Sequence, residues 1–359
     1  MEVYWLWLSL IKGIGPVTAK KLLQHYKNPY CIYNATKDEL ENINVLNINQ
    51  LEELITSKSL ENAQNIIKEC KAREIKVLTC SDELYKEKAK LCSKSPIVLF
   101  YRGTIIKENL SVGIVGARRC TEYGKKVAAE TGEYLAQNNV TVISGMAKGI
   151  DSYAHTGCLK SGGYTLAFLG SGVDICYPCE HSVLMNRIIE NGAVISGFLP
   201  STKPIQSNFI MRNYLLSAWC EKLLVVEASE RSGALTTAKF AKENKTEIYA
   251  APNNIYAEEG KGTNKLIEEG AKIYLTPNQL VDKKNCLNIS TCQDVDSYNL
   301  SILQNQILSL LRNKPKNLEE ILFLIKGKRE VIIETLSIME VEGMTQWTPQ
   351  GITSNINRW

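Results

Sequence analysis

Residues 111–124 read SVGIVGARRCTEYG and decide the fold of this 359-residue chain. An apolar, strand-like run ends at Gly116, a short turn follows, and a helical pattern begins. This order is how a doubly wound α/β sheet opens. The turn lacks the second glycine of a dinucleotide-binding G-x-G-x-x-G motif, because Ala117, Arg118 and Arg119 come next. The stretch therefore predicts a Rossmann-like sheet whose first turn faces a ligand other than a dinucleotide.

The same alternation continues from about residue 111 to residue 277. Short apolar runs rich in valine and isoleucine are separated by stretches of helical length, with apolar residues three and four apart. Strands that are apolar throughout and separated by helices indicate a parallel sheet covered on both faces. We therefore predict the fold class α/β, with an extended Rossmann-like, doubly wound, mostly parallel sheet. The predicted strands are SVGIVG, VTVISG, YTLAFLG, AVISGF, KLLVVEAS and EIYAAP.

The regions on either side of this sheet predict smaller domains. The predicted segments are an all-α, helix–hairpin–helix or SAM-like domain (1–62), a connecting segment (63–110), the Rossmann-like domain (111–282), a linker (283–299) and a winged-helix domain (300–359). In the N-terminal segment (1–62), a tight turn formed by glycines, together with Lys12, Lys20 and Lys21, could contact a DNA backbone. The alternative is a small helical domain that packs or recruits a partner. The third helix of the winged-helix pattern has balanced charge, which favours a structural or protein-contact role over groove reading.

Composition and cysteine usage predict a cytoplasmic protein. The net charge of +4 is mildly basic, which tolerates an acidic partner such as nucleic acid without requiring one. The apolar start carries Glu2 where a signal peptide needs positive charge, and it is too short to span a bilayer. Eleven cysteines then suit a reducing compartment, where most act as small hydrophobes. Cys176 and Cys179 have no second pair at zinc-ribbon spacing, so no metal is predicted.

Candidate ligand-binding residues come directly after the apolar runs, because ligands of an open parallel sheet bind beyond the carboxyl ends of its strands. Glycines there let backbone amides approach an oxyanion, and basic side chains neutralise it. Several such loops on one edge predict a phosphate-binding rim. Arg118 is its predicted anchor, since a planar guanidinium suits bidentate capture, whereas Arg119 could simply be solvated. The predicted phosphate-binding residues of these loops are Gly116, Arg118, Arg119, Gly145, Lys148, Gly170, Ser171, Gly172, Ser232 and Gly233.

Several enzyme motifs are absent from the sequence. There is no G-x-G-x-x-G followed by an acidic residue about 20 positions later, and no P-loop, so no nucleotide cofactor is predicted. None of the three histidines belongs to an H-E-x-x-H motif. Asp151 and His155 lie four residues apart, on one helical face. They could form a general-base pair, or an Asp that caps a helix beside a partly buried His.

Taken in order, these loops resemble the DNA-processing protein A family (DprA, also called Smf). The matching stretches are IVGARRCTEYG, VISGMAKGIDSYAHTGCL, GGYTLAFLGSGVDICYP, FIMRNYLLSAW, LLVVEASERSGALTTAKFA and KGTNKLIEEGAKI. They run in the family's order across most of residues 111–277. The combination of SGMAKGID, GSGVDICYP and SGALTTA is far more specific than a single glycine loop. The flanking regions match the family's flanking domains more loosely.

The resemblance implies a protein without catalytic activity or cofactor that binds single-stranded DNA. It also implies protection of incoming DNA during natural transformation (competence), loading of the RecA recombinase onto that strand, and a homodimer formed through the central domain. The short apolar start separately predicts no membrane contact. By motif, the arginine of the family's G-[ST]-R turn is Arg118, and the glycine- and serine-rich phosphate loops fall on the loop residues named above. The family's F-P-x-R-N-R motif falls on residues 209–214, giving Arg212 and Asn213 as further phosphate-binding residues.

The chain departs from the family pattern at four places. Ile210 and Tyr214 replace the proline and the final arginine of F-P-x-R-N-R, Gly197 replaces the glutamate of S-E-Y-P, and Cys179 stands where a basic residue often follows Tyr-Pro. The lost positive charge predicts weaker phosphate binding than in a typical member. Phe209 and Tyr214 could offset part of this loss by stacking on bases, typically worth about 1–3 kcal/mol each. The alternative is that both rings lie in the core.

Two other functions fit the same sequence. The fold also hosts nucleoside-monophosphate phosphoribohydrolases, and Glu227 before a Ser-Gly-Thr loop could be the acid of such a site. Those enzymes resemble P-G-G-x-G-T at that turn, which Ser232, Gly233 and Ala234 do not match. The other alternative is a structural adaptor that acts through its flanking domains.

Overall fold

The computed structural model of the chain describes residues 1–107, 110–281, 302–311, 314–325, 345–348 and 351–354, with Arg329, Ile332, Ile333, Thr335, Leu336 and Met339. The chain divides into two compact units, residues 1–286 and residues 287–359. Each unit has its own hydrophobic core. The predicted linker, 283–299, lies outside the described residues.

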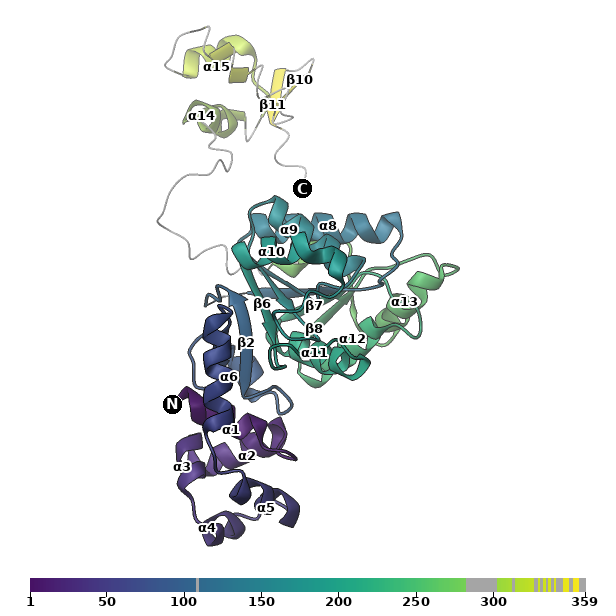
Figure 1. The fold of residues 1–359 in the computed structure, drawn as a ribbon. Helices are drawn as coiled ribbons and strands as arrows, with labels where there is room; N and C mark the ends of the chain where they lie inside the picture. The colour runs from purple at the N-terminus through teal and green to yellow at the C-terminus, as the bar shows by residue number, and fades with distance from the viewer. Residues whose placement is uncertain are drawn as a thin grey trace. The chain divides into compact units, whose positions relative to one another are not determined.

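A nine-stranded sheet forms the centre of the first unit (Figure 1). Its strand order is β1-β2-β6-β5-β4-β3-β7-β8-β9. The strands from β6 to β9 pair in parallel, and β1 and β2 add an antiparallel edge. The prediction of a mostly parallel α/β sheet is confirmed, and each predicted apolar run overlaps one of the strands β3 to β8. The strands are β1 (Lys76–Thr79), β2 (Val98–Gly103), β3 (Ser111–Val115), β4 (Thr141–Ser144), β5 (Thr165–Phe168), β6 (Gly192–Ser196), β7 (Lys222–Val225), β8 (Glu247–Ala250) and β9 (Lys272–Ile273).

Helices cover both faces of this sheet, as Figure 1 shows. One face carries α8 (Glu122–Gln137), α9 (Ile150–Lys160) and α10 (Ser182–Glu190), and the other carries α11 (Gln206–Trp219) and α12 (Gly233–Glu243). Apolar side chains of α8 and α9 share one core with β3 and β4, and those of α11 and α12 share another with β5 and β7. Glycines let α8 and α9 pack closely, because a Cβ at Gly132 or Gly157 would collide with the facing backbone.

The connections reverse direction between β3 and β7. The chain runs from β3 through β4 and β5 to β6 on one side, and then returns to place β7 on the other side of β3. In a doubly wound sheet, the loops that leave such a pair diverge and open a crevice at the carboxyl ends of the strands. The turn that carries Arg118 follows β3, so it lies at this point of reversal.

The N-terminal region is helical, as predicted from its sequence. It contains α1 (Glu2–Leu10), α2 (Pro16–Tyr26), α3 (Pro29–Asn34), α4 (Lys37–Asn42), α5 (Ile48–Thr56) and α6 (Glu61–Ala72). Its buried residues, such as Trp5 and Leu22, belong to a core that continues to β6. The ammonium group of Lys20 donates to three carbonyl oxygens at the end of α7 (Glu87–Leu91), at 2.5–3.4 Å. Lys20 therefore fixes α2 to α7, and the expectation that it helps contact DNA is not supported by its position.

The segment predicted as a connection, 63–110, contributes β1 and β2 to the sheet. The antiparallel pairing of β2 with β6 places Phe100 opposite Ser196. The sequence analysis did not assign these two strands: β2 lies in the apolar run IVLFY (97–101), which has the pattern of a buried strand, but both strands stand outside the strand–helix alternation from which the sheet was predicted. Beyond β8, α13 (Lys261–Glu268) leads to the edge strand β9.

The second unit contains two described helices and a hairpin. These are α14 (Ile302–Leu311), α15 (Leu318–Leu324), β10 (Thr345–Thr348) and β11 (Gly351–Ser354). Its core contains Ile307, Ile321, Leu336 and Ile352. Most of the predicted third helix lies outside the described residues, so the winged helix stays a prediction. In the described part of the chain, no helix is long and apolar enough to span a bilayer.

Candidate functional site

The turn after β3 brings the two arginines to the surface. Arg118 and Arg119 are exposed, whereas Gly116 is half-buried against Ile150. The next loop supports this turn, because the amide of Ile150 donates to the carbonyl oxygen of Ala117 at 3.2 Å. The predicted placement of the two guanidinium groups at the carboxyl edge of the sheet therefore agrees with the structure. We use the name rim loops for residues 116–121, 145–149, 169–178 and 226–232, which follow β3, β4, β5 and β7.

An aromatic ring lies between two of the predicted arginines. The guanidinium carbon of Arg118 is 5.6 Å from the centroid of the Phe209 ring, and that of Arg212 is 5.7 Å from the same centroid. Tyr177, which is 44% exposed, packs on Phe209 with a centroid distance of 5.5 Å. Phe209 sits over Gly170, where a Cβ would come within 2.8 Å of the ring. These contacts define the Phe209 cluster: Arg118, Tyr177, Phe209 and Arg212.

Arg212 lies beneath the surface of the site and holds its loops in place. This position corrects the prediction that Arg212 binds phosphate directly. Only 6% of the residue is exposed. One terminal nitrogen donates to the carbonyl oxygens of Gly145 and, at 3.0 Å, Phe168, while Nε donates to Oδ1 of Asn213 at 2.9 Å. A guanidinium held in this way has little access to an external phosphate. The pattern F-x-x-R-N could not reveal this burial, because α11 buries polar and apolar side chains alike.

A protein carboxylate occupies the place where the loop after β4 was predicted to bind phosphate. The amides of Gly145 and Ala147 donate to Oδ2 of Asp151, at 3.1 and 3.4 Å. Burial raises the pKa of Asp151, and the positive charge of Arg212 and the two amides oppose that rise. The Gly145 amide is therefore engaged inside the protein. Asp151 lies in the first turn of α9, whose N-cap is Gly149 without a side-chain cap hydrogen bond, so Asp151 does not cap this helix and instead joins it to the loop after β4.

The loop after β5 is also occupied by internal contacts. The amide of Gly172 donates to the carbonyl oxygen of Thr202 at 2.9 Å. The hydroxyl of Ser171 donates to the carbonyl oxygen of Ile175 at 3.1 Å, and this serine is 2% exposed. Ser171 and Gly172 thus shape the loop, and their predicted contact with phosphate is not supported by this arrangement. Gly170 contributes by making room for Phe209.

Lys148 and the start of α12 remain accessible. Lys148 is exposed and forms an ion pair with Glu180, a residue that follows the Tyr-Pro pair. Ser232 caps α12 by accepting a hydrogen bond from the amide of Ala234 at 3.2 Å. Gly233 is exposed, with open space where a Cβ would stand, and its carbonyl oxygen accepts from Nδ2 of Asn213 at 3.4 Å. An anion could approach this helix terminus closely.

Tyr214 lies in the core, contrary to its predicted stacking on bases. It is 4% exposed and packs edge-on against Phe240, with centroids 5.3 Å apart. Its hydroxyl accepts a hydrogen bond from the amide of Lys94 at 3.4 Å. Tyr177 is the exposed aromatic residue at the rim loops instead. The Tyr-Pro pair marked its position in the sequence, but its exposure depends on the fold of the loop.

Two candidate catalytic groups are enclosed. Glu227 is fully buried, and the hydroxyl and amide of Thr121 at the start of α8 donate to its carboxylate. His155 is fully buried, its Nδ1 lies 2.7 Å from the hydroxyl of Thr165, and burial lowers its pKa to about 3. His155, on α9, thus stays neutral where this helix packs against the sheet. Within the described ranges, no cluster of three or more His, Cys, Asp or Glu side chains is arranged to hold a metal ion.

The accessible groups described above include three cations, two aromatic rings and one helix terminus. Arg118, Arg119 and Lys148 carry the positive charge, and Phe209 and Tyr177 carry the rings. Such a combination suits a flexible polyanion whose units also have flat apolar faces.

A family model described as DNA recombination-mediator protein A matches residues 76–285. Protein Smf of Synechocystis sp. is 32% identical over 285 residues, which cover 78% of this chain and 72% of that protein. Other matches are shorter: a putative DNA processing protein DprA of Mycobacterium tuberculosis is covered over 51% of its length. Among solved structures, DprA of Streptococcus pneumoniae is 27% identical with a TM-score of 0.67, and the match covers 78% of this chain and 95% of that one.

A second solved structure, DNA processing protein A of Helicobacter pylori, is described for its single-stranded DNA binding mode. It is 26% identical with a TM-score of 0.52, and the match covers 57% of this chain and 93% of that one.

Proposed function

Because the chain belongs to the DNA recombination-mediator protein A family, as its sequence predicted, we propose that it binds single-stranded DNA across the rim loops. The observation that carries this proposal is the exposed guanidinium of Arg118 on the Phe209 ring, at the reversal point of the sheet. The guanidinium can pair with a phosphate, and the rings offer stacking surfaces to any base. The single-stranded DNA binding described for the Helicobacter pylori relative supports the same class of ligand.

The binding test uses a labelled dT oligonucleotide and fluorescence anisotropy at low salt. Arg118→Ala is expected to weaken binding about 10-fold or more, since it removes a charge-assisted contact. Lys37→Ala, an exposed lysine of α4 that pairs with Glu41, is the matched control and should bind like the unchanged chain. If the unchanged chain binds no single-stranded DNA at low salt, the proposal fails.

We propose further that the chain acts in the cytoplasm as a mediator that protects incoming DNA and loads RecA onto it. Family membership supports the recombination role. RecA loading predicts that the protein speeds formation of RecA filaments on a DNA strand already covered by a single-strand-binding protein. This is measured as the lag before DNA-dependent ATP hydrolysis by RecA, and an unchanged lag would argue against loading.

We also propose that the protein works without catalysis. The burial of Glu227 beneath Thr121 supports this view, because a general acid must reach its substrate. Incubation with AMP tests the phosphoribohydrolase alternative, and release of adenine at catalytic rates would overturn the proposal.

A homodimer through the central domain is the last part of the proposal. In the described part of the chain, β9 ends the sheet; Ile273 in this strand is 48% exposed, and Leu275 just after it is 71% exposed. An exposed apolar edge strand favours pairing with another chain. Light scattering should give twice the mass of one chain, and Leu275→Glu should lower it; a monomer at all concentrations would contradict the proposal.

A further inference from the structure

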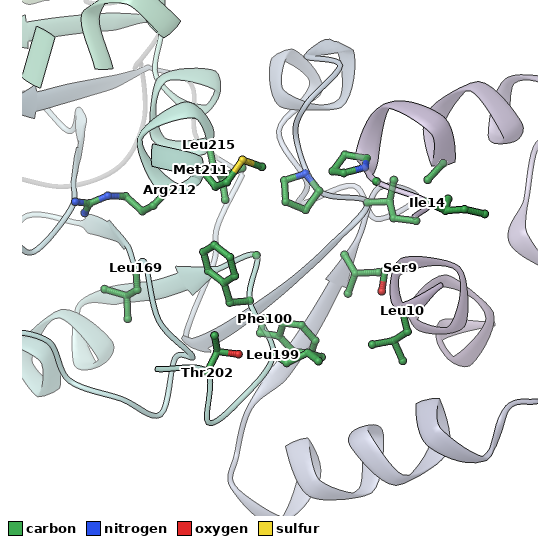
Figure 2. Close-up of a pocket in the computed structure, with 18 residues that line it drawn as sticks. Ser9, Leu10, Ile14, Phe100, Leu169, Leu199, Thr202, Met211, Arg212 and Leu215 are labelled. Atoms are coloured by element: carbon green, nitrogen blue, oxygen red, sulfur yellow. The ribbon is translucent and has the colours of Figure 1, made fainter. Parts of the chain in front are cut away.

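A cavity of about 360 Å³ lies between the α1–α2 turn and the carboxyl edge of the sheet (Figure 2). Figure 2 shows Phe100 and Leu199 between Leu169 on the sheet side and Ile14 on the helical side. Its volume falls in the range of ordinary small-molecule sites. Nothing in the phosphate-binding role of the rim loops accounts for this cavity.

The walls suit a flat, uncharged group. Phe100, Phe198 and Met211 contribute apolar and aromatic surface. The one ionisable side chain of the lining is that of Arg212, and its guanidinium points away from the cavity toward the backbone of β5. An ionic ligand would therefore lose its hydration without gaining a partner.

The cavity and the rim loops share their walls. Leu169 lines the cavity, and the ring of Phe209, in the Phe209 cluster, packs over the next residue, Gly170. Thr202 also lines the cavity, and its carbonyl oxygen holds the amide of Gly172 in the same rim loop. A DNA strand bound at the rim loops therefore lies next to this cavity.

One hydroxyl group of the lining is available to a ligand. Among the hydrogen bonds of residues 110–281, none uses the side chain of Thr202, and Figure 2 shows this side chain beside Leu199. A hydroxyl can donate or accept, so it can pair with the edge of any base without selecting one. The hydroxyl of Ser9, on the opposite wall, already donates to the carbonyl oxygen of Leu6 at 2.7 Å.

We propose that this cavity takes one unstacked nucleobase of the single strand held by the rim loops. The inference rests on the proposed function. The base enters against Phe198 and Leu199, with its edge toward Thr202, and the α1–α2 turn forms the far wall. The N-terminal helices thereby take part in binding DNA through a base instead of through the phosphate backbone.

The first experiment compares dT oligonucleotides that carry one abasic site at successive positions. In the unchanged full-length chain, one position should weaken binding by roughly 5- to 100-fold, the range expected for loss of one buried, stacked base. Leu199→Trp fills the cavity and should weaken binding to a similar extent, with no further loss from the abasic site. Ile205→Trp changes an exposed residue outside the cavity and is the matched control; it should behave like the unchanged chain.

The outcomes separate the two proposals. If the unchanged chain fails to bind single-stranded DNA, the proposed function itself is wrong. If it binds, but every abasic position has the same small effect and Leu199→Trp binds normally, only the cavity proposal is overturned. Photo-crosslinking with 5-iodouracil in the unchanged chain gives an answer even if the variant misfolds: crosslinks at Phe198 or Leu199 support the cavity, and crosslinks confined to Tyr177 and Phe209 refute it.

Discussion

Arg212→Met, which removes a buried guanidinium, should destabilise the fold strongly while leaving the affinity for DNA nearly unchanged at temperatures where the protein is folded. Methionine fills a similar volume but donates no hydrogen bond. The carbonyl oxygens of Gly145 and Phe168 lose their donor, and Asp151 loses the positive charge that opposes its desolvation. Removing one member of a buried, charged network typically costs about 3–5 kcal/mol. At roughly 2–4 °C per kcal/mol for a unit of this size, the unfolding midpoint should fall by about 6–20 °C.

The assay is thermal unfolding followed by circular dichroism, together with anisotropy binding at a temperature where both proteins are folded. Arg118→Met is the matched control, because this arginine is exposed on the same ring. The control should lose affinity for DNA while its stability changes by no more than about 0.5 kcal/mol. The reasoning is refuted if Arg212→Met keeps its midpoint within about 2 °C and loses affinity as Arg118→Met does. In that case Arg212 would be a direct phosphate ligand.

Three further substitutions test other parts of the site. Gly170→Ala places a Cβ 2.8 Å from the Phe209 ring, so it should weaken DNA binding while the unfolding midpoint shifts by less than about 3 °C; unchanged affinity would show that the ring position is unimportant. Glu180→Gln releases Lys148 from its ion pair and should raise affinity about 2- to 5-fold at low salt, an effect that must disappear at high salt. His155 has a pKa of about 3 in the folded chain, below its usual 6.5, so its neutral form contributes stability that is complete above pH 6.5 and is lost as the pH falls toward 3. Chemical denaturation should show the unfolding free energy falling by up to about 1.4 kcal/mol per pH unit more steeply in the unchanged chain than in His155→Gln, and parallel slopes would contradict this.

The sheet was predictable because its parallel strands are buried on both faces. SVGIV, TVIS and KLLV are apolar or small nearly throughout, and each leads into a helix that begins within about ten residues. The antiparallel edge was not predictable in the same way. The strand β1 has the burial pattern of an edge, with Lys76 exposed and Thr79 buried, and β2 pairs antiparallel with both of its neighbours, so neither strand fits the regular strand–helix alternation that marks the parallel strands.

The candidate site was predictable in position but only partly in roles. Glycine-rich loops after strands indicate where backbone amides gather, and Arg118 lies where its motif places it. Whether an amide stays free depends on contacts distant in sequence. The amide of Gly172 is engaged by Thr202, thirty residues later, and Gly145 by Asp151 after a turn that brings a carboxylate back to the loop. Such pairings depend on the loop path, which no local pattern specifies.

The measurement that tests the account most directly is the salt dependence of single-stranded DNA affinity for the unchanged chain and for Arg118→Ala. Each phosphate contacted on a single strand contributes about −0.7 to the slope of log affinity against log salt concentration. With Arg118, Arg119 and Lys148 at the rim loops, the slope should be about −2, and Arg118→Ala should make it shallower by about 0.7. Identical slopes for the two proteins, or no binding by the unchanged chain at low salt, would contradict the claim that the rim loops bind DNA phosphates through Arg118.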